Sequence, residues 1–212
     1  MAYGSAAARF KPHQSRASKA VLLPLIVLAR ASFPAFGEAK EVSAKNAGAI
    51  EMEQMTIEVV DFKISNLDQV FYIQRTAYQP LFEKYRDEST NPYMETRETV
   101  LRKYTRTGTK GYLILKDKTA VGAVRVALND KYGRISALCV LPQFQGQGIA
   151  QTALLKIDCM HPEIEMWFFD TILEEAGNCR LYEKIEYRKT GKTEKINDKM
   201  TLVYYEKRSE NG

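Results

Sequence analysis

A glycine-rich turn between an apolar stretch and a helix is the part of this sequence best suited to chemistry. Residues 138–150 read LCVLPQFQGQGIA, so the apolar stretch ends at Pro142 and a helix is expected from Ile149, directly after Gly146 and Gly148. Glycine permits a positive φ and lets the backbone approach a ligand without a Cβ in the way. The start of a helix presents free N–H groups and a partial positive charge. The pattern therefore predicts an anion-binding site, with a pyrophosphate as the favoured ligand.

Other anion-binding motifs fit this turn less well. A Walker A loop requires Gly-Lys-Ser/Thr, which does not follow the second glycine here. A dinucleotide-binding fingerprint requires a third glycine and a strand at the start of the chain, whereas this turn follows three consecutive strand-like segments. A turn that joins a strand to a helix without any ligand is the remaining alternative.

Two motifs in this chain are similar to those of one known family. Residues 143–148 match Q/R-x-x-G-x-G/A and follow a Val-x-Pro sequence at 140–142. Further along, residues 178–187 read NCRLYEKIEY, which is similar to N-x-x-L-Y-E-K-x-G-F/Y. Together with a matching order of elements over residues 56–207, these motifs resemble the GNAT family of N-acetyltransferases. Residues 1–50 take no part in the resemblance.

The resemblance implies a mode of binding for acetyl-CoA as co-substrate, with no metal. Members of the family hold it in a V-shaped gap between the fourth and fifth strands, here residues 134–141 and 164–170. The pyrophosphate is expected on backbone N–H groups of the glycine turn. Backbone around Val140 and Leu141 is expected to bind the pantetheine and the acetyl carbonyl. The cofactor-binding residues implied in this way are Cys139, Val140, Leu141, Gln143, Phe144, Gln145, Gly146, Gln147, Gly148, Ile149, Ala150 and Asn178.

Tyr182 is the catalytic residue that the resemblance implies. It stands at the position of a tyrosine that, in many members of the family, lies near the CoA sulfur and protonates the departing thiolate. A phenol with an ordinary pKa of about 10 is protonated at neutral pH, so it can act as an acid without special tuning. The alternative is a helix tyrosine that only packs against the cofactor or the core. Asn178, four residues earlier, is expected on the same helix face, where its amide would meet the cofactor or cap the helix.

The sequence departs from the family pattern in two places. Glu186 occupies the usual glycine position, at a turn that often needs positive φ, so an adjusted turn or strain of about 1 kcal/mol is expected. No carboxylate on the fourth strand suggests itself as the general base, and water, Asp170, Glu174 or a residue of the 85–93 loop remain open. Cys139 is interpreted as a buried strand thiol rather than a nucleophile, because neither histidine has a reason to lie near it.

Strand-like and helix-like segments alternate after residue 55. Strands are expected at 56–62, 111–116, 120–128, 134–141, 164–170 and 200–205, and helices at 65–81, 94–104, 149–157 and 173–185. The order β-α-α-β-β-β-α-β-α-β predicts an α/β fold in which a mixed central sheet is flanked by helices, as in the GNAT-like acyl-CoA N-acyltransferase fold. The second to fourth strands are expected to form an antiparallel meander.

Composition and charge point to one globular domain. The 212 residues are 45% hydrophobic, and we expect an appended segment at 1–54, a GNAT domain at 55–208 and a tail at 209–212. Three cysteines without a CxxC pair, and only two histidines, argue against a disulfide scaffold or a zinc site. The net charge is +5, but residues 1–54 hold seven basic and four acidic side chains, so the body is nearly neutral. It does not resemble a nucleic-acid-binding protein.

The first 54 residues raise the question of targeting. The apolar run AVLLPLIVLA at 20–29 follows basic residues and precedes an A-x-A site, as in a secretory signal peptide, but Pro24 interrupts it. An organellar transit peptide and a segment without function are the other interpretations. The run is too short to span a bilayer, and no membrane association is expected for the folded domain. We expect a cytoplasmic protein, unless residues 1–35 are a genuine leader that directs it to an organelle or out of the cell.

The leading functional hypothesis is direct transfer of an acetyl group from acetyl-CoA to a primary amine of a small molecule. The region 78–94 carries carboxylates and aromatic rings that suit a cationic amine. A protein or peptide amine as acceptor, and a non-catalytic acyl-CoA-binding module of the same fold, are the alternatives. A homodimer is left open.

Overall fold

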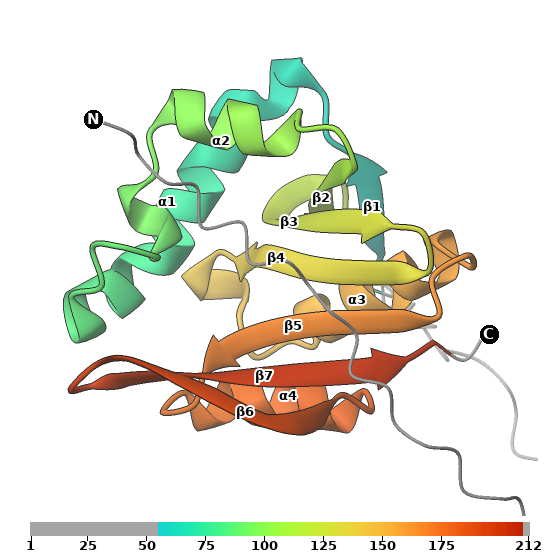
Figure 1. The fold of residues 1–212 in the computed structure, drawn as a ribbon. Helices are drawn as coiled ribbons and strands as arrows, with labels where there is room; N and C mark the ends of the chain where they lie inside the picture. The colour runs from blue at the N-terminus through green and yellow to red at the C-terminus, as the bar shows by residue number, and fades with distance from the viewer. Residues whose placement is uncertain (1–54, 210–212) are drawn as a thin grey trace, which may run out of the picture. The chain divides into compact units, whose positions relative to one another are not determined.

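The computed structural model describes residues 55–209 (Figure 1). The expectations for the 1–54 segment, its boundary and most of the tail therefore lie outside the described residues. The strands are β1 (Ile57–Asp61), β2 (Thr109–Lys116), β3 (Thr119–Asn129), β4 (Tyr132–Val140), β5 (Met166–Ile172), β6 (Arg188–Asn197) and β7 (Met200–Arg208). The helices are α1 (Leu67–Tyr85), α2 (Arg97–Tyr104), α3 (Ile149–Met160) and α4 (Ala176–Lys184), with short 3-10 turns at Ile64–Asn66, Pro92–Met94 and Pro142–Phe144.

The described strands form one mixed sheet in the order β1-β2-β3-β4-β5-β7-β6. The predicted meander is confirmed, because β2, β3 and β4 pair antiparallel in sequence. The strands β4 and β5 are parallel, and β5 and β7 are antiparallel. The prediction of a mixed central sheet flanked by helices is therefore correct.

Several element predictions were wrong in detail: the helix expected at 65–81 continues to Tyr85, and the helix expected at 173–185 begins only at Ala176. The strand β6 was missed, because its sequence RKTGKTEKIN has no apolar alternation and most of its residues are exposed at the edge of the sheet. The helix α2 begins at Arg97 rather than near Met94. The reason is local: Thr96 caps the helix by accepting a hydrogen bond from the backbone N of Thr99, at 3.2 Å.

The two faces of the sheet carry separate apolar cores. On one face, α1 packs Val70, Ile73 and Ala77 together with residues of α2, β2, β3 and β4. On the other face, α3 and α4 cover a larger cluster that includes Trp167, which is 1% exposed. Figure 1 shows α1 and α2 together on one side of the strands. None of the helices among residues 55–209 is long and apolar enough to cross a membrane.

A buried polar cluster ties α3 to the last strand. Asp158 accepts hydrogen bonds from Trp167 Nε1 at 2.8 Å and from Ser209 Oγ at 2.8 Å. It also pairs with Lys207, whose Nζ lies 3.0 Å from Oδ2, and the lysine side chain is only 5% exposed. Each of these partners of the Asp158 carboxylate is a hydrogen-bond donor, so the buried negative charge is compensated. The cluster therefore fixes the C-terminal end of the sheet against α3.

Candidate active site

The strands β4 and β5 separate soon after they begin. They pair only where Tyr132–Arg134 lies beside Met166–Phe168, and beyond this the ladder ends. A cleft of about 910 Å³ lies at the divergence, lined by both strands and by residues of α1, α3 and α4. The gap that the resemblance implied between these two strands is thus present.

A β-bulge in β4 lies on the wall of this cleft. Cys139 pairs with Ala123 but Ser136 pairs with Arg125, so two residues of β4 stand opposite one residue of β3. Ala137 has φ 49°, the left-handed conformation expected at such an irregularity. The Tyr78 hydroxyl of α1 donates a hydrogen bond to the carbonyl of Leu138 at 3.0 Å. A bulge leaves backbone groups outside the regular ladder, so it can offer an N–H to a bound carbonyl.

The glycine turn leads from β4 into α3 on the same cleft. Gly146 and Gly148 have φ 74° and 76°, so a residue with a side chain would be strained at either position. An added Cβ at either glycine would meet nothing within 4 Å, which leaves room above the backbone. The first bond of the helix joins Thr152 N to Gly148 O at 2.9 Å, so the preceding first-turn N–H groups are available to a ligand. This turn has the geometry of an anion cradle.

The glutamines of the motif stabilise the loop with their side chains. Gln145 Nε2 donates to the carbonyl of Val140 at 2.8 Å, and Gln147 Nε2 donates to the carbonyl of Gln143 at 3.3 Å. Gln147 Oε1 accepts a hydrogen bond from Lys116 Nζ of β2 at 2.8 Å. Lys116 therefore adds a positive charge beside the turn, and sequence reasoning missed it.

The structure brings most of the residues implied for acetyl-CoA to one cleft. Nine of them line it, namely Cys139, Val140, Phe144, Gln145, Gly146, Gly148, Ile149, Ala150 and Asn178. Leu141, Gln143 and Gln147 are not among the lining residues. The N–H of Leu141 already donates to the carbonyl of Val121 at 2.8 Å. The role expected for the backbone around Val140 and Leu141 stays a prediction.

Tyr182 extends from α4 to the wall of the cleft. Its ring is 6% exposed and packs against Phe169 of β5, with ring centroids 4.0 Å apart. Its hydroxyl makes no hydrogen bond to any residue that the structure describes. Burial raises the pKa of Tyr182 well above its ordinary value, and the neighbouring Asp170 carboxylate raises it further. The phenol therefore keeps its proton at physiological pH.

Of the residues considered as the general base, Asp170 is the one at the cleft whose side-chain contacts do not serve the fold alone. It lines the cleft at the end of β5 and pairs with Arg134. Burial raises the pKa of Asp170, and the Arg134 guanidinium opposes that rise. Glu174 is not a lining residue, and it accepts a hydrogen bond from Thr201 N at 3.0 Å. Asp87 of the loop accepts from the backbone N–H groups of Ser89 and Thr90.

Cys139 has no catalytic environment. Its side chain is buried, and Sγ lies 3.6 Å from the carbonyl of Ala123. Burial raises the pKa of the thiol to about 12, so a thiolate is not available near neutral pH. His161 is instead bonded to Tyr112, with Nε2 2.7 Å from the hydroxyl oxygen. The interpretation of Cys139 as a buried strand thiol is therefore correct.

Comparison with known families agrees with this geometry. The model of the acetyltransferase (GNAT) family matches residues 78–187, which is more than half of the chain. This chain belongs to the GNAT acetyltransferase family. No curated protein matches the whole sequence significantly.

Solved GNAT structures share the fold at low sequence identity. The ribosomal-protein-S18-alanine N-acetyltransferase of Escherichia coli is 9% identical with a TM-score of 0.60, and the match covers 73% of this chain and 94% of that one. The spermidine N-acetyltransferase of Vibrio cholerae, solved with CoA and spermine, is 15% identical with a TM-score of 0.59 over 73% and 96%. The PaiA N-acetyltransferase of Thermoplasma acidophilum, solved with CoA, is 14% identical with a TM-score of 0.55 over 71% and 98%.

The left-handed turn after α4 is the clearest local departure of this GNAT protein. Glu186 has φ 70°, so the chain keeps the glycine conformation with a glutamate. Of the two expectations, the structure shows the left-handed turn, and the strain expected of a glutamate in that conformation stays a prediction. Glu186 is exposed and is not among the residues that line the cleft, so this turn does not reshape the site.

Proposed function

We propose that this GNAT protein transfers the acetyl group of acetyl-CoA directly to a primary amine of a small molecule. The observation that carries the proposal is the divergence of β4 and β5, with the glycine turn of α3 and the bulge of β4 on the same cleft. The bulge and the glycine turn follow one another along the chain, so this arrangement can hold a thioester and a pyrophosphate at once.

The chemistry needs little beyond positioning and two proton transfers. The amine nitrogen attacks the thioester carbon, and a backbone N–H of the bulge stabilises the negative charge that develops on oxygen. The carbon–sulfur bond then breaks, and the Tyr182 hydroxyl gives its proton to the departing thiolate. The attacking nitrogen, which becomes protonated in the tetrahedral intermediate, loses one proton to water or to Asp170, which lies at the cleft beside Tyr182. A proton from solvent then restores the Tyr182 hydroxyl.

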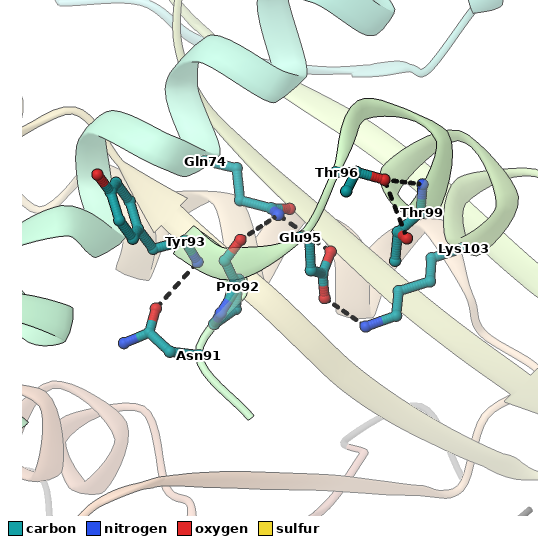
Figure 2. Close-up of polar contacts among 8 residues, drawn as sticks. All are labelled: Gln74, Asn91, Pro92, Tyr93, Glu95, Thr96, Thr99 and Lys103. Carbon is teal, nitrogen blue, oxygen red and sulfur yellow. Dashed lines mark hydrogen bonds and ion pairs between the residues drawn. The ribbon is translucent and has the colours of Figure 1, made fainter. Parts of the chain in front are cut away.

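A small acceptor is favoured by the wall of the cleft that contains Pro92, Glu95 and Lys103. There, η2 (Pro92–Met94) and α2 are fastened to α1 through Gln74, whose Nε2 donates to Pro92 O at 3.0 Å and to Glu95 Oε2 at 3.1 Å (Figure 2). Glu95 also pairs with Lys103 of α2. Because several side-chain hydrogen bonds and an ion pair hold this wall in place, it leaves less room for a folded protein substrate than a loop attached at a single point would leave.

An acceptor panel assayed for free CoA release tests the proposal. Full-length protein is incubated with acetyl-CoA and with amino acids, polyamines, aromatic amines and short peptides, while acetyl-CoA binding is measured separately by calorimetry. Release of CoA with small amines supports the proposal. Binding of acetyl-CoA without release by any acceptor would favour the acyl-CoA-binding module, and turnover confined to peptides would favour the protein-directed alternative. Subcellular fractionation would test the cytoplasmic location that we propose with it.

A further inference from the structure

The charged side chains that line the cleft mostly neutralise each other. Glu175 oxygen Oε1 lies 2.7 Å from Lys84 Nζ and accepts a hydrogen bond from Tyr85 at 2.7 Å. The other lining residues that form ion pairs are Arg134 with Asp170 and Lys103 with Glu95. Asp87 is held by backbone N–H groups of its own loop. Among the described lining residues, the cations left without an acidic partner are Lys184, exposed at the end of α4, and Arg125.

Arg125 is held inside the fold without a partner for its charge. It lies in the middle of β3, paired with Ser136 directly beside the bulge of β4. Its guanidinium carbon is 5.6 Å from the centre of the Tyr104 ring, on the face covered by α1 and α2. Nη1 is buried and has no hydrogen-bond partner among the described residues, and the same is true of the Tyr104 hydroxyl. A buried guanidinium N–H without an acceptor is costly, and a bound anion would supply that acceptor.

A nearby carboxylate, that of Glu95, already has other partners on both of its oxygens. Burial is the main cause of the raised pKa of Tyr104, and the Glu95 carboxylate makes a smaller contribution in the same direction. Glu95 therefore lies close to the Tyr104 hydroxyl. Its Oε1 is engaged by Lys103 and its Oε2 accepts from Gln74 (Figure 2). Gln74 Oε1 is also buried without a hydrogen-bond partner, but a neutral amide oxygen cannot neutralise the guanidinium charge. Arg125, which lines the cleft, therefore has no acidic partner among the described residues.

The aromatic and acidic residues beside this wall already have partners within the protein, so they offer few contacts to a polycation. The ring of Tyr93 already carries Arg75, whose guanidinium carbon is 4.5 Å from its centre, and it stacks on Phe82 with centroids 5.0 Å apart. The Asp87 carboxylate points into its own turn. Tyr93, Phe82 and Asp87 are therefore already engaged within the protein, and binding of a cationic amine by the 78–94 region stays a prediction.

Resting on the proposed acetyl transfer, we propose that Arg125 binds a carboxylate of the acceptor, so that the acceptor is an amine that also carries a carboxylate, such as a free amino acid. The planar guanidinium matches a carboxylate with two parallel hydrogen bonds. Because Arg125 stands beside the bulge, a carboxylate held there leaves the amino group of the same small molecule within reach of the thioester carbonyl.

The test compares matched molecules that differ only in the carboxylate. Calorimetry with CoA-saturated full-length protein measures binding of N-acetylphenylalanine and of N-acetylphenethylamine, and of N-acetylalanine and N-ethylacetamide. These products require no turnover, so the result stands even if the protein proves to be a binding module. We expect the carboxylate member of at least one pair to bind more than about ten-fold more tightly, as for hydrogen bonds to a charged group.

The variant Arg125→Met keeps the length of the side chain and removes the charge. It should abolish the difference in affinity between the two ligands of each pair, whereas Arg102→Met, at an exposed position of α2, should preserve that difference. Thermal melting and acetyl-CoA binding show whether each variant is folded. Where acceptors turn over, the ratio of kcat/KM for phenylalanine to that for phenethylamine should fall by the same factor in Arg125→Met. Equal binding within both pairs, equal losses for both members, or tighter binding of the uncharged members would overturn the proposal.

Discussion

The Tyr182→Phe variant separates the chemical role of the hydroxyl from the packing of the ring. The ring contacts Phe169 at 4.0 Å between centroids and Tyr205 at 6.2 Å, and phenylalanine keeps both contacts. Because the hydroxyl has no hydrogen-bond partner among the described residues, its removal breaks no bond in the protein. The free energy of unfolding should therefore change by no more than about 0.5 kcal/mol.

The rate should respond quite differently. If the hydroxyl protonates the thiolate, kcat should fall by about 10² to 10⁴-fold, which is about 2.7 to 5.4 kcal/mol of transition-state stabilisation, while acetyl-CoA affinity holds. The assay is steady-state CoA release at saturating substrates, checked by single-turnover kinetics so that chemistry is rate-limiting. Tyr187→Phe is the matched control. This tyrosine is 5% exposed and its ring centroid is 6.2 Å from that of Tyr182, but it does not line the cleft. It should leave kcat unchanged.

The pH profile gives an independent check. Burial raises the pKa of Tyr182, so the folded protein keeps this proton at pH values where a free tyrosine would lose it. The acid is then lost only above about pH 10, and kcat should show no alkaline decline from this group below that value. An unchanged kcat in Tyr182→Phe would refute the acid role and leave water or unassisted thiolate departure. Weaker acetyl-CoA binding with unchanged kcat would identify the hydroxyl as a binding contact.

Three substitutions elsewhere test the cradle, the strained turn and the buried ion pair. Gly146→Asp should weaken acetyl-CoA binding by more than about ten-fold in calorimetry, because a carboxylate would stand at the cradle, whereas neutral Gly146→Asn, equally tolerant of positive φ, should lose less; equal losses would argue against an anion there. Glu186→Gly should raise the free energy of unfolding by about 1 kcal/mol in denaturant titration, since φ is 70°, and a destabilised variant would show that the glutamate is not strained. Lys207→Met should lower it by about 3 kcal/mol by leaving Asp158 unpaired, and adding Asp158→Asn should recover part of the loss; additive losses would contradict the pairing.

Several features were predictable because their causes are local. The positive φ of Gly146 and Gly148 follows from the residue type at a short motif, and the meander follows from three strand-like segments joined by short turns. By contrast, β6 could not be predicted, because its residues are polar on both faces at the sheet edge. Its partner β7 makes it a strand, and no periodicity within residues 188–197 reveals this.

The contacts that complete the site join residues far apart in the chain. Tyr78 reaches Leu138, Lys116 reaches Gln147, and Arg134 reaches Asp170, each across more than thirty positions. Neither partner in such a pair carries a local signal, because the contact depends on which elements the sheet order places side by side. The amino acids alone thus specify a glycine turn, its helix and the tyrosine of the second motif. Packing of the sheet and helices settles which charges are neutralised and leaves Arg125 without a partner, because electrostatic pairing depends on distance in space rather than along the chain.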